Sequence, residues 1–400
     1  MKTADWQSGD GSIRLYQGDC AAVLADLPEK SVNCCVTSPP YWGLRDYGTA
    51  EWEGGDAGCD HIKGEMRRGV NLAQSQASTR GGAKKCAEVA NIPFGDTCGK
   101  CGARRIDSQL GLEATPEEYV DKLVEIFRQV RRVLRDDGTV WLNLGDVYAH
   151  ASSGGGGAVD IRTDGRKTTP GDKVRGRMAG ANTLISGLKP KDLCGIPWRV
   201  AFALQADGWY LRQDIIWAKP NPMPESVTDR CTKAHEYIFL LSKKARYWFD
   251  AEAIKEKADN RTGGAPRVFG AIEQEGTNRK DIGLTFMDNG IRNKRSVWTV
   301  ATRPYPEVHF ATYPAKLIEP CILAGCPAGG VVLDPFIGSG TTAEVCATKG
   351  RGCIGIELNR EYMELAIRRI RPAIQQGPDD ALFRQKAEQP EQLLMKVDDG

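Results

Sequence analysis

The sequence lacks three features that would mark a membrane protein, a secreted protein or a strongly basic nucleic-acid-binding protein. No uninterrupted apolar run approaches the roughly 20 residues that are needed to cross a bilayer. No charged and then apolar stretch opens the chain, so we expect a cytoplasmic protein without a membrane partner. The formal net charge is only +2, and any surface basic enough to bind nucleic acid must therefore be local.

The cysteines do not indicate a disulfide framework. There are 13 of them, but they are spread over 400 residues without a secretion signal, which favours reduced thiols. The length and the hydrophobic content of 41% fit one large α/β domain with insertions or two domains. We interpret the cysteines in apolar surroundings as small core residues: Cys34, Cys35, Cys321, Cys346 and Cys353.

The stretch Thr-Ser-Pro-Pro-Tyr-Trp at residues 37–42 follows an apolar run that predicts a buried strand at residues 32–36. Ligands of open α/β sheets bind at the carboxyl ends of strands. The two prolines stiffen the loop and turn backbone carbonyls outward as acceptors. An amino group on a planar base can then donate to Ser38 and to a proline carbonyl while its ring stacks on Tyr41. Taken alone, the stretch is more typical of a rigid surface turn.

A second motif lies near the other end of the chain. A predicted strand at residues 331–333 leads into Asp-Pro-Phe-Ile-Gly-Ser-Gly-Thr-Thr at residues 334–342, and a helix is expected from residue 343. Glycines allow a ligand to approach the backbone, and the amino end of the helix offers N–H groups to a carboxylate. A second strand ends at Glu357, about 20 residues after the glycine turn, where nucleotide-type folds place an acid that accepts from ribose hydroxyls.

Together the two motifs resemble those of the amino-group DNA methyltransferases. That family has Asp, Asn or Ser before Pro-Pro-Tyr/Phe/Trp, and the glycine turn with its downstream Gly-x-Glu resembles the family's S-adenosylmethionine motif. The catalytic motif comes first, as in the permuted β class. The resemblance implies a Rossmann-like fold of the S-adenosylmethionine-dependent methyltransferases: a doubly wound, mixed seven-stranded sheet whose seventh strand is antiparallel. It also implies double-stranded DNA as the substrate.

The same resemblance implies roles for individual residues. The catalytic residues are then Ser38, Pro39, Pro40 and Tyr41. The cofactor-binding residues are Asp19, Phe310, Lys316, Asp334, Phe336, Gly338, Ser339, Gly340, Thr341 and Glu357. The target-base pocket contains Trp42, Trp217, Lys219 and Asn221. From the residues alone, Asp19 is explained equally well as a helix cap and as a cofactor-binding residue.

Residues 52–107 differ from the flanking sequence in being glycine-rich and basic, with few periodic apolar positions. The turn Cys-Gly-Lys-Cys-Gly at residues 98–102 is typical of a zinc knuckle, in which two thiolates chelate one ion. Cys59, His61 or both can complete a tetrahedral site, and Cys86 is a competing ligand; free thiols in a loop are the alternative. We predict a structural zinc site formed by Cys59, His61, Cys98 and Cys101.

Apolar periodicity and turn residues divide the remaining chain. The patterns predict helices at residues 21–27, 116–134 and 196–207, and strands at residues 13–18, 139–144, 210–218, 234–241 and 247–249. Residues 151–188 are glycine-rich and basic, as expected of a flexible loop or of an arm that becomes ordered on phosphates. We divide the chain into a catalytic half (1–51 and 108–250), the zinc-binding insertion (52–107), the basic loop (151–188), a target-recognition region (251–295), a cofactor-binding half (296–370) and a flexible tail (371–400).

The implied reaction is direct methyl transfer to an exocyclic amino group of a base that is flipped out of the duplex. Serine at the first catalytic position is the family's usual mark for cytosine N4, and aspartate is its mark for adenine N6. We therefore predict an N4-cytosine methyltransferase, with N6-adenine as the alternative. A non-catalytic DNA-binding protein on the same scaffold is the alternative of another class. The sequence leaves open a phage, orphan or restriction-modification role with a cognate restriction endonuclease, and it leaves open a monomer or a homodimer.

Overall fold

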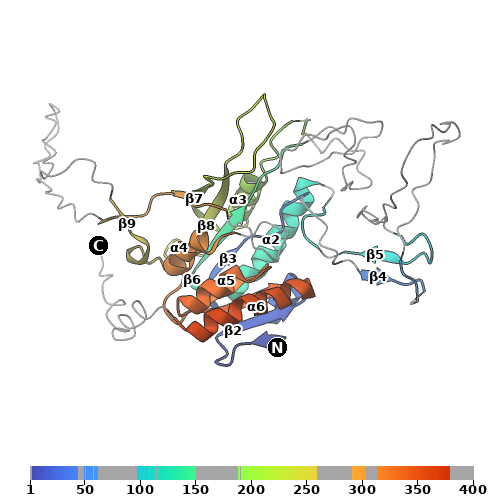
Figure 1. Ribbon diagram of the computed structural model, residues 1–400, viewed down its shortest axis with the longest axis horizontal. Coiled ribbons are helices and arrows are strands. Elements are labelled where there is room, and N and C mark those ends of the chain that lie inside the picture. Colours follow the sequence, from blue (N-terminus) through green and yellow to red (C-terminus); the bar gives the residue numbers. More distant parts are fainter. Residues whose placement is uncertain are drawn as a thin grey trace, which may run out of the picture.

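The computed structural model of the chain describes residues 2–43, 49, 51–56, 58–61, 97–107, 109–113, 115–149, 188–189, 191–258, 291–302 and 313–378. Within these residues, nine strands form one sheet in the order β1-β2-β13-β12-β3-β6-β8-β7-β11 (Figure 1). Its strands are β1 (Trp6–Gln7), β2 (Ile13–Gln17), β3 (Val32–Thr37), β6 (Leu134–Leu144), β7 (Tyr210–Ala218), β8 (His235–Ser242), β11 (Val297–Thr299), β12 (Val331–Asp334) and β13 (Gly352–Glu357). The expected body of seven strands is confirmed, and the short strands β1 and β11 extend its two edges.

Most of the sheet is parallel. The five adjacent strands β2, β13, β12, β3 and β6 all run parallel to one another. β8 runs antiparallel to both of its neighbours, β6 and β7, and is the antiparallel strand that the resemblance implied. The amino end of β8 therefore lies at the same edge of the sheet as the carboxyl ends of the parallel strands.

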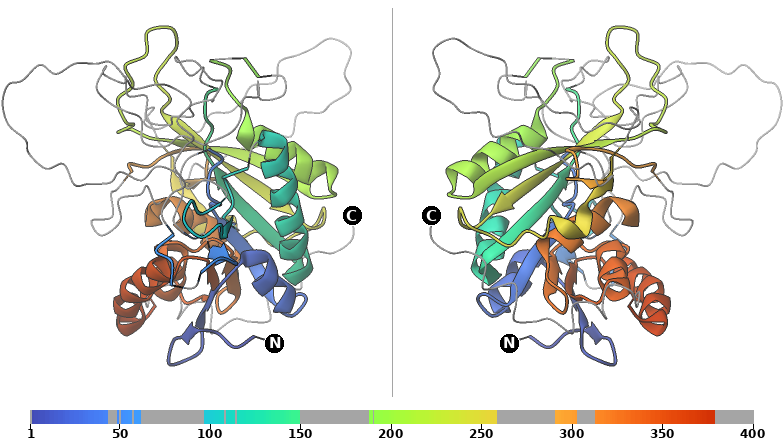
Figure 2. Two further views of the ribbon diagram at one scale, coloured as in Figure 1. Left: turned by 90° about the vertical axis from the view of Figure 1, so that its right-hand side faces the viewer. Right: turned by 90° about the vertical axis from the view of Figure 1, so that its left-hand side faces the viewer.

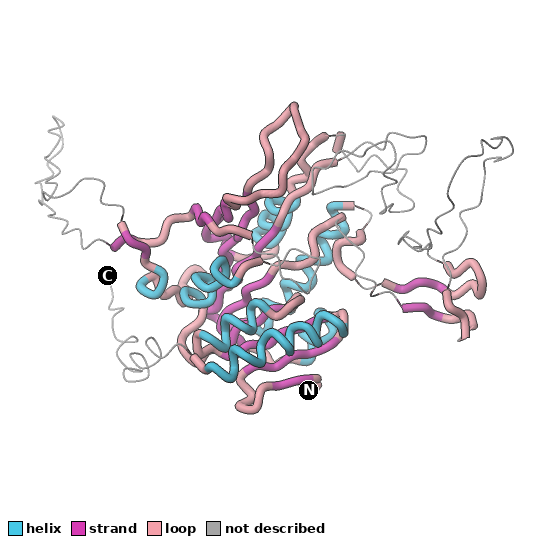
Figure 3. The backbone as a smooth tube through the Cα atoms, viewed as in Figure 1, coloured by secondary structure: helices cyan, strands magenta, loops and turns pink. Residues whose placement is uncertain are grey.

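Helices cover both faces of the sheet and give three layers (Figures 2 and 3). The helices α1 (Cys20–Asp26), α2 (Pro116–Val133) and α3 (Ile196–Ala206) contribute to one hydrophobic cluster. The helices α4 (Ala315–Gly325), α5 (Thr341–Thr348) and α6 (Arg360–Gln376) contribute to the cluster on the other face. None of the described helices is both long and apolar enough to cross a membrane.

The crossovers diverge between β3 and β12. From β3 the chain crosses by α2 to β6 on one side, and from β12 it crosses by α5 to β13 on the other side. β3 and β12 are adjacent and parallel, with Cys34 opposite Val332 and Cys35 opposite Leu333. Their carboxyl ends form the topological switch point, where ligands of doubly wound sheets bind.

Three local predictions need correction. β6 starts at Leu134 rather than at residue 139, because Leu134 pairs with Val32 and the ladder continues after a register shift. Residues 247–249 form no strand; the Trp248 amide donates to Asp137 O at 2.8 Å, outside a ladder. Helix α6 continues past Ile370, where we expected the tail to begin, to Gln376, since Ala373 is still buried and Ile374 packs against the hydrophobic cluster.

Four of the predicted segments lie mostly outside the described residues. Outside are residues 62–96 of the insertion and 379–400 of the tail, and also residues 151–187 of the basic loop and 259–290 of the target-recognition region. At the two ends of the latter, β9 (Glu256–Lys257) pairs with β10 (Ile291–Arg292), next to the short 3-10 helix η1 (Glu252–Ile254). In the insertion, β4 (Glu51–Glu53) pairs with β5 (Arg104–Ile106) to form a hairpin. The five cysteines predicted to lie in the core are buried, as expected: Cys34, Cys35, Cys321, Cys346 and Cys353.

Candidate active site at the switch point

A buried carboxylate joins the two motifs. Thr37, the last residue of β3, donates to Asp334 Oδ1 at 2.6 Å, and the Phe336 amide donates to the same oxygen at 3.1 Å. Asp334 Oδ2 accepts from Thr342 Oγ1 at 2.6 Å and from Tyr313 Oη at 2.8 Å. Asp334 is 0% exposed, and burial raises the pKa of its carboxyl although these hydrogen bonds oppose the shift. Asp334 thus fixes the glycine turn to the strand that carries the Ser-Pro-Pro-Tyr loop.

The Ser-Pro-Pro-Tyr loop faces a network of polar side chains from β6 and β8. Ser38 Oγ lies 3.3 Å from Asn143 Oδ1, and Tyr41 Oη lies 3.1 Å from the same oxygen. Tyr41 also donates to Glu236 Oε2 at 2.7 Å, and the other oxygen of Glu236 binds the Lys219 ammonium group. Burial, and then the charge of Glu236, raises the pKa of Tyr41 well above its usual value, so the hydroxyl keeps its proton.

Sequence reasoning missed Asn143 and Glu236. Asn143 lies next to the last residue of β6, and Glu236 lies near the amino end of the antiparallel strand β8. The first could have been found as a polar residue at the carboxyl end of a predicted strand. The second could not, because only the antiparallel pairing of β8 brings the start of that strand to the same edge of the sheet.

The tyrosine ring is held in place by backbone. A Cβ atom at Gly145 would lie 2.5 Å from Tyr41 Cε2, so only glycine leaves room for the ring. A Cβ atom at Gly111, whose φ is +94°, would lie 2.8 Å from the Tyr41 carbonyl oxygen. Tyr119 donates to Pro40 O at 2.8 Å. Among the described residues, no hydrogen bond reaches the Pro39 carbonyl, which stays available as an acceptor.

The residues predicted for the target-base pocket are not all brought together. Lys219 reaches the network through Glu236. Trp42 is 2% exposed and donates to Glu113 O at 2.9 Å, beneath the loop. Trp217 is buried, and its ring N–H donates to Val300 O at 2.7 Å. Asn221 forms two hydrogen bonds with the backbone of Thr302. Among these four, only Lys219 binds a side chain of the network around Tyr41, and its ammonium nitrogen lies 4.3 Å from the centroid of the Trp217 ring.

Two glycines of the turn differ in the space around them. Gly338 has φ +51°, and a Cβ atom there would meet nothing closer than Phe336 O at 3.9 Å. Gly340 has φ +83°, and a Cβ atom there would lie 2.9 Å from Ala366 of α6, so glycine lets that helix pack closely. Among the described residues, the turn therefore packs tightly against α6 at Gly340 and leaves room for a further atom at Gly338.

Glu357 ends β13 beside this turn. Its two oxygens accept from the amides of Gly338 at 2.9 Å and Asn359 at 2.8 Å. Burial raises the pKa of Glu357 to about 7. Hydroxyl groups of a ligand that donate to this carboxylate would favour its ionised form.

The other predicted cofactor residues occupy different settings. Arg369 donates to the hydroxyls of Ser339 at 3.1 Å and Thr341 at 2.7 Å, so both side chains are already used within the protein. Asp19 accepts from the Ala22 amide at 2.9 Å and caps α1. Lys316 is exposed in the first turn of α4, and Phe310 lies outside the described residues.

The predicted metal ligands converge. The ligand atoms of Cys59, His61, Cys98 and Cys101 all lie within 4.8 Å of one another. Cys86, the competing ligand, lies outside the described residues.

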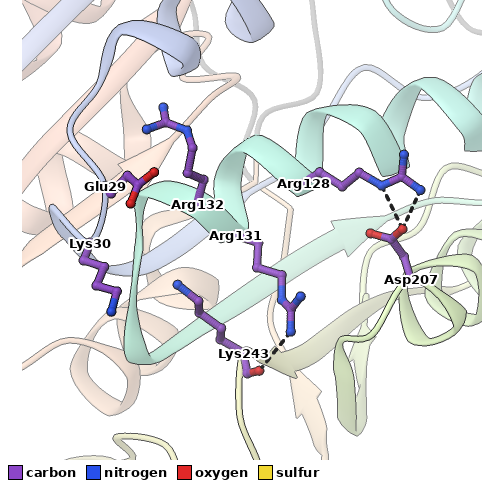
Figure 4. A pocket seen from close by; sticks show the side chains of 7 residues that line it. All are labelled: Glu29, Lys30, Arg128, Arg131, Arg132, Asp207 and Lys243. Atoms are coloured by element: carbon purple, nitrogen blue, oxygen red, sulfur yellow. Dashed lines mark hydrogen bonds and ion pairs between the residues drawn. The ribbon is translucent and has the colours of Figure 1, made fainter.

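A separate hollow is lined in part by Glu29 and Lys30 (Figure 4). These two residues come just before β3, so the hollow lies at the edge of the sheet opposite to the candidate active site. Arg128 binds Asp207 at 2.6 Å, and Arg132 donates to Leu24 O at 2.6 Å at the end of α1. The cations at this hollow thus join neighbouring helices.

Comparisons with known proteins agree with this geometry. A family model described as DNA methylase matches residues 32–368. The chain is similar to the type II methyltransferase M.Cfr9I of Citrobacter freundii, with 40% identity over 371 residues that cover 92% of this chain and 90% of that protein. It is 42% identical to the type II methyltransferase M.SmaI of Serratia marcescens over 360 residues, covering 90% and 91%. The solved structure of the cytosine-N4-specific PvuII DNA methyltransferase has a similar fold, with a TM-score of 0.50 and 16% identity, over 92% of this chain and 89% of that chain.

Proposed function

This chain belongs to the family of DNA methylases that modify exocyclic amino groups, and we propose that it transfers a methyl group from S-adenosylmethionine to N4 of cytosine in double-stranded DNA. The observation that supports this most directly is the Thr37–Asp334 bond, which holds the Ser-Pro-Pro-Tyr loop against the glycine turn. Two motifs that are almost 300 residues apart in sequence therefore form one site.

The residues of the glycine turn fit the cofactor. The room at Gly338 lets a ligand approach the backbone, and the half-buried carboxylate of Glu357 is suited to ribose hydroxyls. When bound, S-adenosylmethionine supplies a methyl group on a positively charged sulfur. The protein residues that would hold it are those around the turn and the ends of β2, β12 and β13: Asp19, Phe336, Gly338, Gly340 and Glu357.

The amide of Asn143 determines the role of Ser38. Asn143 Nδ2 donates to Tyr237 O at 3.0 Å, which turns Oδ1 toward Ser38 and Tyr41. Tyr41 has a closer acceptor in Glu236, at 2.7 Å. The proton of Ser38 therefore goes to Asn143 Oδ1, at 3.3 Å, or to Tyr41 Oη, at 3.4 Å. The lone pairs of Ser38 Oγ then accept one amino hydrogen of the base, and the Pro39 carbonyl accepts the other. These two bonds orient the amino nitrogen for direct attack on the methyl group, and proximity supplies much of the rate.

The preference for cytosine comes from Ser38. Serine at this position is the mark of N4-cytosine enzymes in the resembled family, although an adenine amino group offers the same two donors. Since the relatives M.Cfr9I and M.SmaI are type II methyltransferases, we infer a sequence-specific enzyme that protects DNA against a cognate endonuclease. In this proposal the target base is flipped into the site, and residues 251–295, with the basic segment 151–188, contact the DNA.

The test is methyl incorporation into duplex DNA followed by mass spectrometry of the nucleosides. We expect N4-methylcytosine, and its loss in Ser38→Ala but not in Ser31→Ala, a control before the other end of β3 whose hydroxyl donates to Pro28 O. N6-methyladenine without N4-methylcytosine would overturn the choice of base. DNA binding without any incorporation would favour a non-catalytic DNA-binding protein on this scaffold.

A further inference from the structure

The cysteine and histidine cluster has the dimensions of a metal site. Cys59 Sγ lies 3.8 Å from Cys98 Sγ, and Cys101 Sγ lies 3.6 Å from His61 Nδ1. In a tetrahedral zinc site with Zn–S near 2.3 Å and Zn–N near 2.0 Å, neighbouring ligand atoms are separated by about 3.5–3.8 Å. The four side chains therefore already surround a point at which one ion fits.

The backbone around the cluster holds this arrangement. The Gly102 amide donates to Cys98 O at 2.9 Å and the Cys98 amide donates to Ala103 O at 2.8 Å, which forms the tight turn between the two cysteines. A Cβ atom at Gly55 would lie 2.7 Å from Cys101 Sγ, so glycine allows that sulfur to approach the opposite strand. The ring of His61 stacks on Trp52 with centroids 4.8 Å apart, which fixes its orientation.

A disulfide explains the cluster less well. A bonded pair of cysteines would have its sulfurs about 2.05 Å apart, whereas Cys59 and Cys98 are 3.8 Å apart. A disulfide would also use two of the three cysteines and leave the third, and the convergent histidine, unexplained. Three thiolates and one imidazole are a common ligand set for structural zinc.

The hairpin that carries the cluster is small in the part of the insertion that the structure describes. β4 and β5 each have three residues, and they stand to one side of the main sheet (Figures 1 and 3). An isolated two-stranded hairpin is at best marginally stable in water. A bound metal ion supplies the stability that such a segment cannot obtain from a core.

The hairpin is joined to the catalytic loop at its base. Thr49 Oγ1 donates to Asp107 Oδ1 at 3.0 Å, and this bond joins the chain just before β4 to the chain just after β5. Beyond β5, Gly111 O accepts from the Gly43 amide at 2.8 Å and Glu113 O accepts from Trp42. The segment that follows the hairpin therefore forms the support on which Tyr41 and Trp42 rest.

We propose that Cys59, His61, Cys98 and Cys101 bind one structural Zn²⁺ ion, which orders the β4–β5 hairpin and thereby fixes the support of the catalytic loop. Each cysteine binds as a thiolate and releases its proton to solvent. The metal site and its effect on the loop are independent of the reaction; only the effect on kcat rests on the proposed methyl transfer.

The first experiment measures the metal directly. Elemental analysis of the purified full chain, after incubation with zinc and gel filtration, is expected to give one zinc per chain. Cobalt exchanged into the site should show tetrahedral d–d bands and thiolate charge-transfer bands. Cys98→Ser is expected to lose zinc, and Cys231→Ser, which changes an exposed cysteine outside the cluster, is expected to keep it. A full chain that binds no zinc, or a Cys98→Ser protein that retains it, would overturn the site.

The second experiment tests the link to the loop on wild-type protein, so that misfolding of a variant does not intervene. Removal of zinc with a chelator should increase hydrogen exchange in residues 41–43 and 109–113 while leaving β12 and β13 unchanged. It should also lower kcat at least tenfold, and added zinc should restore it. Unchanged exchange in these residues after complete zinc removal would overturn the effect on the loop, even if methyl transfer is confirmed. A protein that binds zinc but transfers no methyl group would overturn the proposed function and not the metal site.

Discussion

Thr37 and Asp334 are 297 residues apart in the chain, yet Thr37 Oγ1 lies 2.6 Å from Asp334 Oδ1. The bond crosses the point where the crossovers from β3 and β12 diverge. Asp334 was expected among the cofactor-binding residues, but both of its oxygens accept from groups of the protein. We therefore predict that Asp334 acts on cofactor binding by aligning the two halves of the site.

Removing this carboxylate should destabilise the protein and weaken cofactor binding together. Asp334→Ala leaves buried hydroxyls without an acceptor, and we expect a loss of about 3 kcal/mol or more in the free energy of unfolding. Thr37→Val removes one bond and should cost about 1 kcal/mol. Denaturant unfolding and calorimetric titration with S-adenosylmethionine measure both effects, with Asp26→Ala, an exposed site at the end of α1, as the control. Wild-type stability in Asp334→Ala would refute this role.

Glu236 should act on the rate rather than on cofactor affinity. Glu236→Gln replaces an acceptor of the Tyr41 hydroxyl by an amide and removes the partner of Lys219. A small displacement of catalytic groups can cost about 100-fold in rate, and we expect kcat to fall by about that factor. The control is Glu252→Gln, since that side chain is 77% exposed on η1. If kcat is unchanged, or if only the Kd for S-adenosylmethionine rises, Glu236 does not position Tyr41.

Gly145 should tolerate no side chain. In Gly145→Ala the new Cβ would lie 2.5 Å from the Tyr41 ring, and either the ring or the end of β6 must move. We expect a loss of about 100-fold in kcat/KM for DNA. Gly9→Ala is the matched control because a Cβ atom there has nothing within 4 Å. Full activity of Gly145→Ala would show that the ring position seen here is not the catalytic one.

Cofactor affinity should depend on pH through Glu357. Its pKa is raised by burial to about 7, and ribose hydroxyls that donate to it favour the ionised form. The Kd for S-adenosylmethionine should therefore be constant above pH 7 and should rise about tenfold per pH unit below it. In Glu357→Gln the Kd should be higher and flat over the same range. A flat wild-type profile would argue against this contact.

The same shift affects the stability of the free protein in the opposite direction. The folded state binds the Glu357 proton more tightly than the unfolded chain, whose value is near 4.5. The free energy of unfolding should therefore fall as pH rises from about 4.5 to about 7, and Glu357→Gln should lack this component.

Local sequence was sufficient where one short segment determines the structure. The cap at Thr115, the proline after it and the apolar periodicity defined α2, whose first-turn Glu118 amide donates to Thr115 Oγ1 as expected of such a cap. The strand and glycine turn at residues 331–342 were identified in the same way. The end of α6 was misjudged because the packing of Ile374 against the hydrophobic cluster outweighs the local signals, which include Pro372 within the helix.

The sequence by itself therefore determined the fold class, the family and the two motifs. All of these were inferred from short contiguous stretches, in which the spacing of the residues determines a helix, a strand or a turn. Only the tertiary structure decided which side chains surround the Tyr41 hydroxyl. Asn143 and Glu236 come from different strands, and the antiparallel pairing of β8 with β6 brings them to one edge. Hydrogen bonds of this kind depend on strand order and direction in space, and no single segment of the chain encodes either.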